Sequence, residues 1–294
     1  MDIETLQTFI DVVRRNSFAA VARKRYQDPS VFSRRIAALE RECGMRLFDR
    51  NTRRLVLTAS GRQVFERLSG PVAAIDQAFD AGRDELQEPS GDLRMPMSTS
   101  MGERWFMPRL AEFRSRFPQV QLDLLLSDQR VDLISAQIDL AIRLGQRVEG
   151  AYAATRLMET RYHIVAAPEL AARFADGKAL NDVEAVVFPL PGYHSTWRLR
   201  DGDGRIEEHE INPTLTISSA LGIRRAVMDG MGVGLLANWM VDDDMTDGTL
   251  VDLFPSHTAS AADFDTSAWL VFPTIDYVPA RTRAMIDHLK ASVM

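Results

Sequence analysis

The first sixty residues constrain the fold most, because signals that start and stop short helices follow one another closely. Apolar residues recur at helical spacing over residues 3–13, which predicts an amphipathic helix. Ser17 is a predicted N-cap for a second helix over residues 18–25. Asp28-Pro29 then starts a third helix, because Asp can cap free N–H groups and Pro fits the first helical position. These elements predict a small helical head.

The third predicted helix, residues 29–42, has two different faces. Its inward stripe consists of Phe32, Ile36 and Leu39. Small polar residues and one arginine face outward near the N-terminus. Such a surface fits the major groove of DNA, where arginine can donate to guanine or phosphate. The DNA contacts predicted from this helix are Pro29, Ser30, Ser33 and Arg34.

A basic segment follows the third helix. Gly44 ends that helix, Leu47-Phe48 returns to the core, and residues 49–57 predict a β-hairpin. Arginines gather at the hairpin tip and complete the predicted DNA contacts: Arg50, Arg53 and Arg54. Residues 1–60 carry 12 Arg/Lys and 7 Asp/Glu, a net charge of +5, whereas the remainder carries 23 and 34, a net charge of −11. A basic head on an acidic body predicts a polyanionic partner.

A long helix is predicted next, with Thr58 or Ser60 as its cap and an end near Pro89. Its apolar residues have near-heptad spacing: Val64, Leu68, Val72, Ile75, Phe79, Gly82 and Leu86. At about 1.5 Å per residue, such a helix is too long to bury this seam on one small domain. We interpret it as a dimerisation helix, with packing on the body of the same chain as the alternative. Pro71 predicts a kink.

After Pro89-Ser90-Gly91, predicted strands and helices alternate. Strands at 93–97, 120–126 and 140–142 are separated by a helix that Pro118 ends and a short helix from Val131. This βαβαβ order predicts a parallel α/β sheet. Ligands bind such sheets beyond the carboxyl ends of strands. The candidate residues at these ends are Ser98, Thr99, Ser100, Arg143, Ser218 and Ser219.

The hydroxyls and a helix N-terminus could hold an anion, and Arg143 could pair with a carboxylate. A small organic acid is therefore the expected ligand. The alternative is that these residues bind no ligand: the hydroxyls only cap helices, and Arg143 only makes a surface ion pair. No metal, cofactor or catalytic residue is predicted, because the histidines lack ligand spacing and no nucleophile motif is present.

Several other signals are given structural interpretations. The glycines of residues 230–234 follow a helix and enter a strand, so they predict a helix C-cap and a tight turn. Asp242-Asp243-Asp244 is interpreted as a solvated helix end. Cys43, the single cysteine, is interpreted as a small core residue, and it excludes an internal disulfide. With no signal peptide and no apolar run of about 18 residues, a cytoplasmic location is expected.

Residues 3–61 resemble the winged helix-turn-helix of LysR-type transcriptional regulators. The resemblance rests on Leu6, Phe9, Ser17-Phe18, Val21-Ala22, Ser33-Arg34, Ile36, Leu39-Glu40, Gly44, Leu47-Phe48, Arg50, Leu57-Thr58 and Gly61. Two positions depart from it. The family usually has glutamine at the position of Pro29, so sequence readout must depend on Ser30, Ser33, Arg34 and DNA shape. It also favours leucine at the position of Arg25, and Tyr26 is expected to take over that packing.

The remaining residues resemble the LysR-type effector domain, which has a periplasmic-binding-protein-like fold. The matching segments include residues 108–110, 117–118, 126–128, 131–133, 139–143 and 230–236. The Leu-Ser-Asp and Asp-Leu-Ala-Ile-Arg segments suggest the CrgA-like branch. The resemblance implies a winged helix-turn-helix at 1–60, a linker helix at 58–89 and an α/β effector domain at 91–294. It further implies lobe I at 91–160 and 268–294, and lobe II at 161–267.

The resemblance implies a transcription regulator that binds double-stranded DNA at an imperfect palindrome and answers to a small-molecule effector. It also implies self-association as a dimer and then a tetramer, and contact with RNA polymerase if the protein is an activator. No membrane partner is expected. The alternative is a cytosolic α/β small-molecule-binding protein or enzyme whose helical head does not bind DNA. That alternative predicts catalytic residues and DNA contact that is weak and insensitive to salt.

Overall fold

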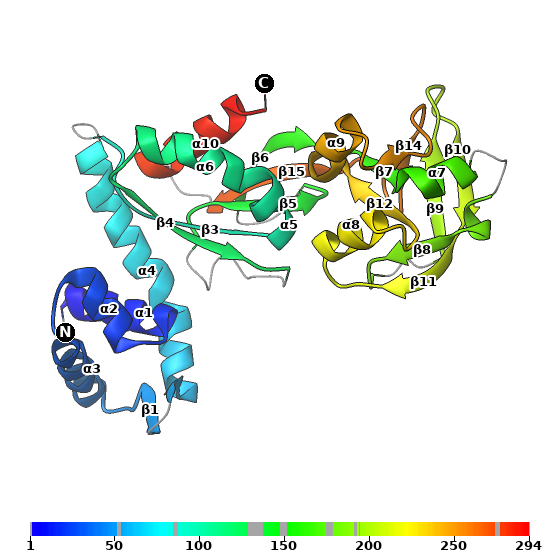
Figure 1. Ribbon diagram of the computed structural model, residues 1–294. Coiled ribbons are helices and arrows are strands. Elements are labelled where there is room, and N and C mark those ends of the chain that lie inside the picture. Colours follow the sequence, from blue (N-terminus) through cyan, green and yellow to red (C-terminus); the bar gives the residue numbers. More distant parts are fainter. Residues whose placement is uncertain are drawn as a thin grey trace. The chain divides into compact units, whose positions relative to one another are not determined.

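The computed structural model describes residues 2–51, 54–84, 88–128, 138–147, 152–174, 179–190, 193, 195–273 and 277–293, with the backbone alone for 50, 51, 54, 73 and 76–84. The chain forms two compact units (Figure 1). The N-terminal unit is built on Met1–Glu88. The C-terminal unit comprises Pro89–Arg130, Asp139–Thr274 and Arg281–Met294.

The N-terminal unit begins with the three predicted helices, α1 (Ile3–Arg15), α2 (Phe18–Arg25) and α3 (Pro29–Cys43). The predicted caps are confirmed. Ser17 Oγ accepts the backbone N–H of Ala20 at 3.2 Å, and Asp28 Oδ1 accepts that of Ser30 at 2.8 Å. Gly44 ends α3 with a φ of +66°, a conformation that favours glycine.

The predicted hairpin consists of β1 (Phe48–Asn51) and β2 (Arg54–Leu57), which pair antiparallel. Arg50 is opposite Leu55 in the register. The predicted tip residue Arg53 lies outside the described residues. The core of the unit joins all three helices to β1 through buried residues that include Phe9, Phe32, Ile36, Leu39, Leu47 and Phe48.

The expectation for Tyr26 is wrong. This residue ends α2 in the left-handed region, with a φ of +52°, and its side chain is 96% exposed. As the cap, it does not continue the inward stripe of the helix. Arg25 packs instead: its guanidinium carbon lies 5.8 Å from the centroid of the Phe32 ring, and its Nη2 donates to Asp11.

The long predicted helix is α4 (Ala59–Asp84), with Pro71 inside it. Thr58 is its cap, since Thr58 Oγ1 accepts the N–H of Gly61 at 2.9 Å. The residues of the predicted apolar seam differ in burial along the helix. Val72 is buried in the core of the N-terminal unit, while Ile75 is exposed. The side chain of Phe79 and the whole of Leu86 lie outside the described residues, and only the backbone of Gly82 is described.

Lobe I of the C-terminal unit has two small sheets. In the first, β3 (Gly91–Met97) and β4 (Val120–Leu126) pair in parallel, as predicted. In the second, β15 (Ser267–Pro273) pairs antiparallel with both β5 (Ala141–Gly145) and β6 (Tyr152–Glu159). The expectation of a parallel sheet is therefore wrong for the 140–142 strand, because a strand from the far end of the sequence supplies its partner. The predicted helix from Val131 lies outside the described residues.

Helices cover lobe I. A helical run comprises α5 (Thr99–Met101), the π-helix η1 (Gly102–Phe106) and α6 (Met107–Arg116). The C-terminal helix α10 (Ala280–Ala291) lies along α6 (Figure 1), where His288 Nε2 is 3.1 Å from the carbonyl oxygen of Arg109. The ring of Phe113 also packs on His288. These contacts place α10 against the lobe I core.

Lobe II is one mixed sheet in the order β10-β9-β14-β7-β12-β8-β11, with β13 also paired to β7. Its strands are β7 (Tyr162–Ala166), β8 (Glu184–Val187), β9 (Thr196–Arg200), β10 (Ile206–Glu210), β11 (Asn212–Thr216), β12 (Val233–Ala237), β13 (Val251–Asp252) and β14 (Thr258–Ser260). Its helices are α7 (Pro168–Phe174), η2 (Leu180–Asp182), α8 (Ala220–Met228) and α9 (Asn238–Thr246). Two hydrophobic clusters form its core.

The glycine segment between α8 and β12 makes the predicted tight turn. Gly230 has a φ of +76° after the end of α8, and Gly232 has a φ of +150° before β12. A Cβ atom on Gly232 would lie 2.5 Å from the carbonyl oxygen of Glu184. Glycine at this position therefore allows β12 to approach β8.

Among the helices of the described ranges, none combines the length and the apolar character that crossing a bilayer requires.

Candidate nucleic-acid interface and interlobe site

The N-terminal part of α3 presents most of the predicted DNA contacts to solvent. Pro29, Ser30 and Arg34 are exposed, and Ser33 is half-buried. Arg34 turns back over the first turn: its Nε donates to the Ser30 carbonyl oxygen at 3.3 Å and its Nη2 to Ser30 Oγ at 3.5 Å. The guanidinium is thus held beside the helix start, where it can meet a base edge or a phosphate.

Asp28 changes what the start of α3 can bind. Hydrogen bonding by the Ser30 side chain, and then by its backbone N–H, holds the pKa of Asp28 below its ordinary value. A carboxylate at a helix N-terminus is stabilised by the helix dipole. Because Asp28 already occupies the Ser30 N–H, this N–H is not open to phosphate. Contacts from α3 must therefore come mainly from side chains.

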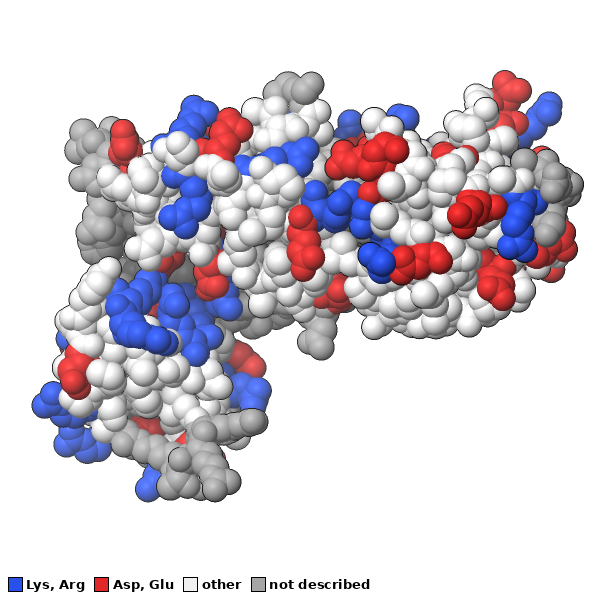
Figure 2. All heavy atoms as spheres, viewed as in Figure 1, with Lys and Arg blue, Asp and Glu red and all other residues white. Residues whose placement is uncertain are grey.

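Basic residues also gather on other parts of the N-terminal unit. The last turn of α1 holds Arg14 and Arg15, and that of α2 holds Arg23, Lys24 and Arg25. Figure 2 shows a cluster of Lys and Arg atoms on the visible face of this unit. Arg25 is engaged by Asp11. The positive potential of the unit consequently extends beyond α3 and the hairpin.

In lobe I, the predicted effector residues lie where β3 passes into helix. Ser98 Oγ accepts the N–H of Met101 at 3.3 Å and lies 3.4 Å from Ser100 Oγ. The N–H of Thr99 donates to Asp128 Oδ1 at 3.0 Å. Ser100 is buried, whereas Ser98 and Thr99 are half-buried. The Ser98 hydroxyl therefore acts as a helix cap, the local role considered as the alternative.

In lobe II, Ser219 caps α8 by accepting the N–H of Gly222 at 3.3 Å, and Ser218 is exposed. Helices α5 and α8 contact each other, so the two serine groups lie at the starts of contacting helices from different lobes. Arg143 is half-buried on β5, opposite Trp269, and β5 contacts β3.

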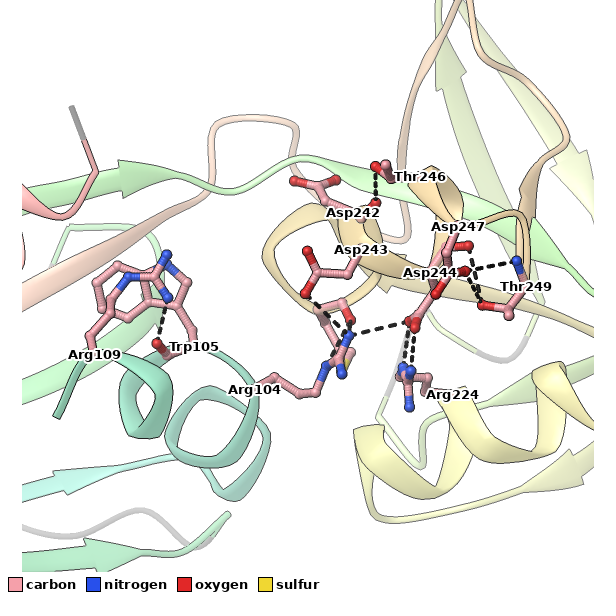
Figure 3. A network of polar contacts seen from close by, with 11 residues as sticks. Arg104, Trp105, Arg109, Arg224, Asp242, Asp243, Asp244, Thr246, Asp247 and Thr249 are labelled. Carbon is pink, nitrogen blue, oxygen red and sulfur yellow. Dashed lines mark hydrogen bonds and ion pairs between the residues drawn. The ribbon is translucent and has the colours of Figure 1, made fainter. Parts of the chain in front are cut away.

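A second group of polar residues joins the lobes and was missed by sequence reasoning (Figure 3). Arg104, on η1 of lobe I, donates from Nε and Nη2 to the Met240 carbonyl oxygen of α9 at 3.2 and 3.1 Å. Its Nη2 is also 3.5 Å from Asp244 Oδ2. Asp244 accepts two hydrogen bonds from Arg224 of α8, one of them from Nε at 2.5 Å.

The interpretation of residues 242–244 as a solvated helix end is wrong for Asp244, which is only 4% exposed. The sequence did contain a signal. Asp244 follows Met240 by four positions and Val241 by three, so helical periodicity places it on the buried face of α9. A buried carboxylate requires cationic or hydrogen-bonding partners, which Arg104 and Arg224 supply.

The described part of the chain lacks a cluster of metal-ligating side chains. No group of three or more His, Cys, Asp or Glu residues there is arranged to hold a metal ion.

Comparison with known families gives two matches that together span nearly the whole chain. Residues 3–62 match a model described as a bacterial regulatory helix-turn-helix protein of the lysR family. Residues 86–293 match the LysR substrate binding domain. The chain is also similar to relatives that are named as transcriptional regulators and not as enzymes.

The regulator DmlR of Escherichia coli K12 is 30% identical over 295 residues, covering 98% of this chain and 93% of DmlR. The regulator CrgA of Neisseria meningitidis serogroup C is 29% identical over 263 residues, covering 87% of this chain and 86% of CrgA. The predicted likeness to the CrgA branch is thus confirmed.

Solved structures share the fold. The structure of CrgA from Neisseria meningitidis has a TM-score of 0.61 and 28% identity, and covers 100% of this chain and 99% of CrgA. The full-length virulence activator AphB of Vibrio cholerae has a TM-score of 0.59 and 22% identity, with 99% of each chain covered. The arrangement of a helix-turn-helix head followed by a two-lobed domain recurs in both.

Proposed function

This chain belongs to the LysR family of bacterial transcriptional regulators, and we propose that α3 reads its DNA target while the interlobe site binds a small organic acid. The observation that carries the first part is the exposed start of α3, where Asp28 caps the helix and Arg34 is held beside Ser30. The hairpin β1–β2 adds Arg50 and Arg54 as further proposed contacts.

The proposed DNA complex is a dimer on an imperfect palindrome. Two copies of α3 would enter successive major grooves, as in other helix-turn-helix dimers. We propose that α4 supplies the dimer contact, with the exposed Ile75 in its seam, and that dimers pair to form tetramers. A cytoplasmic location follows from the need to reach the chromosome.

The test for DNA binding compares two arginines on the same helix. Arg34→Ala removes the guanidinium at the start of α3, whereas Arg41→Ala removes one from its last turn, where Arg41 Nε donates to the Ala37 carbonyl oxygen. We expect Arg34→Ala to weaken binding to the upstream region of its own gene by about ten-fold or more, the effect of losing a good base or phosphate contact. Arg41→Ala should leave affinity nearly unchanged.

Equal affinities of the parent and Arg34→Ala, measured by fluorescence anisotropy across a salt series, would remove α3 from the interface. The dependence of DNA affinity on salt concentration also distinguishes a DNA-binding head from a head with another role. A DNA-binding head predicts that the logarithm of affinity falls linearly with the logarithm of salt concentration. A head with another role predicts weak binding with little slope.

The proposed effector is an anion, because serine hydroxyls of both lobes lie at the starts of the contacting helices α5 and α8, and Arg143 lies on β5, which contacts β3. Ser98, Ser100 and Ser219 supply hydroxyls, and Arg143 supplies the cation for a carboxylate. Effector binding would alter the angle between the lobes, and the linker helix would convert this change into altered spacing of the DNA-binding heads, as a shift between two assemblies.

A thermal-shift screen of the full chain against small carboxylates and aromatic acids tests the effector class. A ligand that binds the folded protein raises the melting temperature by mass action. We expect a hit that disappears in Arg143→Ala and persists in Arg114→Ala, an exposed arginine on α6. A hit that survives in Arg143→Ala would exclude this arginine from the site, and hits among neutral compounds alone would contradict the acid class.

A further inference from the structure

Two adjacent crossings connect the lobes, and they have the form of a hinge. Thr160 lies between β6 of lobe I and β7 of lobe II, and Thr266 precedes β15 on the return. The N–H of Thr160 donates to the Thr266 carbonyl oxygen at 3.0 Å, and Thr266 Oγ1 donates to that of Thr160 at 3.1 Å. Two short connections that lie side by side permit rotation of one lobe against the other.

Helix α9 is tied to the lobe II side of this hinge. The N–H of Asn238 donates to the Arg161 carbonyl oxygen at 2.7 Å, and the N–H of Arg161 donates to Asn238 Oδ1 at 3.1 Å. Arg224 of α8 fixes the other part of α9 through Asp244. The helix is therefore a rigid part of lobe II, and Met240 and Asp244 move with that lobe.

Arg104 contacts this rigid helix from lobe I. Its guanidinium donates from Nε and Nη2 to the Met240 carbonyl oxygen, and the same Nη2 lies 3.5 Å from Asp244 Oδ2 and 3.9 Å from Asp243 Oδ2 (Figure 3). Hydrogen bonds that involve an ionised group are stronger than neutral ones. Rotation about the Thr160–Thr266 hinge would displace Arg104 relative to α9, because the two contact partners belong to different lobes.

We propose that Arg104 is a latch that holds the two lobes at one angle, with the Met240 carbonyl oxygen and Asp244 as its receiving site. Release of the latch permits the lobes to rotate about the hinge. The latch belongs to the chain itself, and its action requires neither an effector nor DNA. It extends the proposed function by naming a charged contact that a change of lobe angle would alter, beside the contact of α5 with α8 and the packing of Trp239 of α9 on the lobe I core.

Arg104 and Arg224 contact Asp244 from different lobes, and this difference makes the latch testable. Arg224 pairs with Asp244 inside lobe II, so the buried carboxylate keeps a cationic partner when Arg104 is replaced. Arg104→Gln should therefore open the latch without leaving a buried charge unpaired. Asp244→Asn is a poorer test, because it also removes the contact that fixes α9 to α8.

The distance between lobes reports the latch directly. The parent is the full chain carrying Cys43→Ala, with spin labels at Ser115→Cys on α6 and Glu169→Cys on α7, two exposed positions in different lobes. Pulsed electron spin resonance, without DNA or ligand, gives the distribution of distances. We expect a narrow distribution for the parent. Arg104→Gln should widen it at least two-fold or shift its mean by several ångströms.

Two matched variants complete the experiment. Arg225→Gln removes a surface ion pair with Asp229 within lobe II and should leave the distribution unchanged. Arg104→Lys keeps the charge but loses the paired donation to Met240, and should give an intermediate width. Hydrogen exchange provides a second measurement: the amides of residues 240–244 should exchange several-fold faster in Arg104→Gln.

A distribution for Arg104→Gln that superimposes on the parent, in a protein with unchanged circular dichroism, would overturn the latch. Unchanged exchange over residues 240–244 would do the same. Neither outcome bears on DNA affinity or on the effector screen. The latch and the proposed function can therefore fail separately.

Discussion

Arg25 Nη2 donates to Asp11 Oδ2 at 2.6 Å, so an ion pair joins α2 to α1 where the family resemblance predicts an apolar contact. The side chains of Arg25 and Asp11 are 24% and 21% exposed, which leaves both partly screened by water. The guanidinium also covers the Phe32 ring. Arg25 therefore combines the packing expected of leucine with a charge contact between two helices.

A double-mutant cycle should reveal coupling between these two residues. We expect Arg25→Ala to lower the free energy of unfolding of the N-terminal unit by about 1 kcal/mol. Asp11→Ala should cost a similar amount, and the double variant less than the sum, with a coupling of about 0.5 kcal/mol. Urea unfolding measures each value. Arg23→Ala, at an exposed position on α2, is the control, and strict additivity would show that the pair contributes nothing.

The carboxyl of Asp28 should titrate below its ordinary pKa of 3.8, because Ser30 hydrogen-bonds its charged form. A lowered folded-state pKa means that the cap stabilises the fold fully above the unfolded value and loses this effect as pH falls through the folded value. Ser30→Ala should move the Asp28 pKa back toward 3.8, but only partly, since the backbone N–H still donates. Carbon-detected NMR titration follows the carboxyl, and a pKa at or above 3.8 in the parent would contradict the cap.

Replacement of glycine by alanine should change the free energy of unfolding in opposite directions at two positions. Gly232→Ala places Cβ against the Glu184 carbonyl oxygen at a φ of +150°, so we expect a loss of more than about 2 kcal/mol. Gly70 lies within α4, where an added Cβ atom would meet nothing within 4 Å, and Gly70→Ala should stabilise the helix by about 0.5–1 kcal/mol. Thermal unfolding compares both with the parent. A tolerated Gly232→Ala would mean that β12 and β8 can separate at little cost.

Self-association should depend on the exposed part of the α4 seam. Ile75→Asp places a charge on the proposed dimer contact and should raise the dimer dissociation constant by at least about ten-fold. Ile206→Asp, at an exposed isoleucine on β10 of lobe II, controls for a general effect of added charge. Sedimentation velocity over a concentration series gives both constants. If Ile75→Asp associates like the parent, the dimer contact lies elsewhere.

Short-range features were predictable because they depend on residues within one turn of each other. Asp28, Pro29 and Gly44 set the start and end of α3 through local hydrogen bonds and allowed backbone angles, and the structure has them as expected. The same holds for the turn at Gly230. The parallel pair β3–β4 was also predicted, since one helical segment connects its strands.

Other features escaped prediction because their partners are distant in sequence. The strands β6, β9, β10, β13 and β14 were missed. Each is held by an antiparallel neighbour, and the alternation of apolar residues does not identify that neighbour. The proposed DNA contacts on α3 could be named from one helical face. For the proposed effector residues, the sequence predicted only that each lies at the end of a strand. Which of them lie near one another depends on which helices are in contact, and the sequence does not predict that.

The sequence by itself determined where helices begin and end, which faces of them are apolar and where positive charge concentrates, because each of these is a property of neighbouring residues. The tertiary structure decided which charges meet. Arg104 and Asp244 are 140 residues apart, and Asp244 stands in a run of three aspartates that looks solvated when read alone. Only the approach of α9 to η1 and α8 removes this one carboxylate from water and gives it two guanidinium partners.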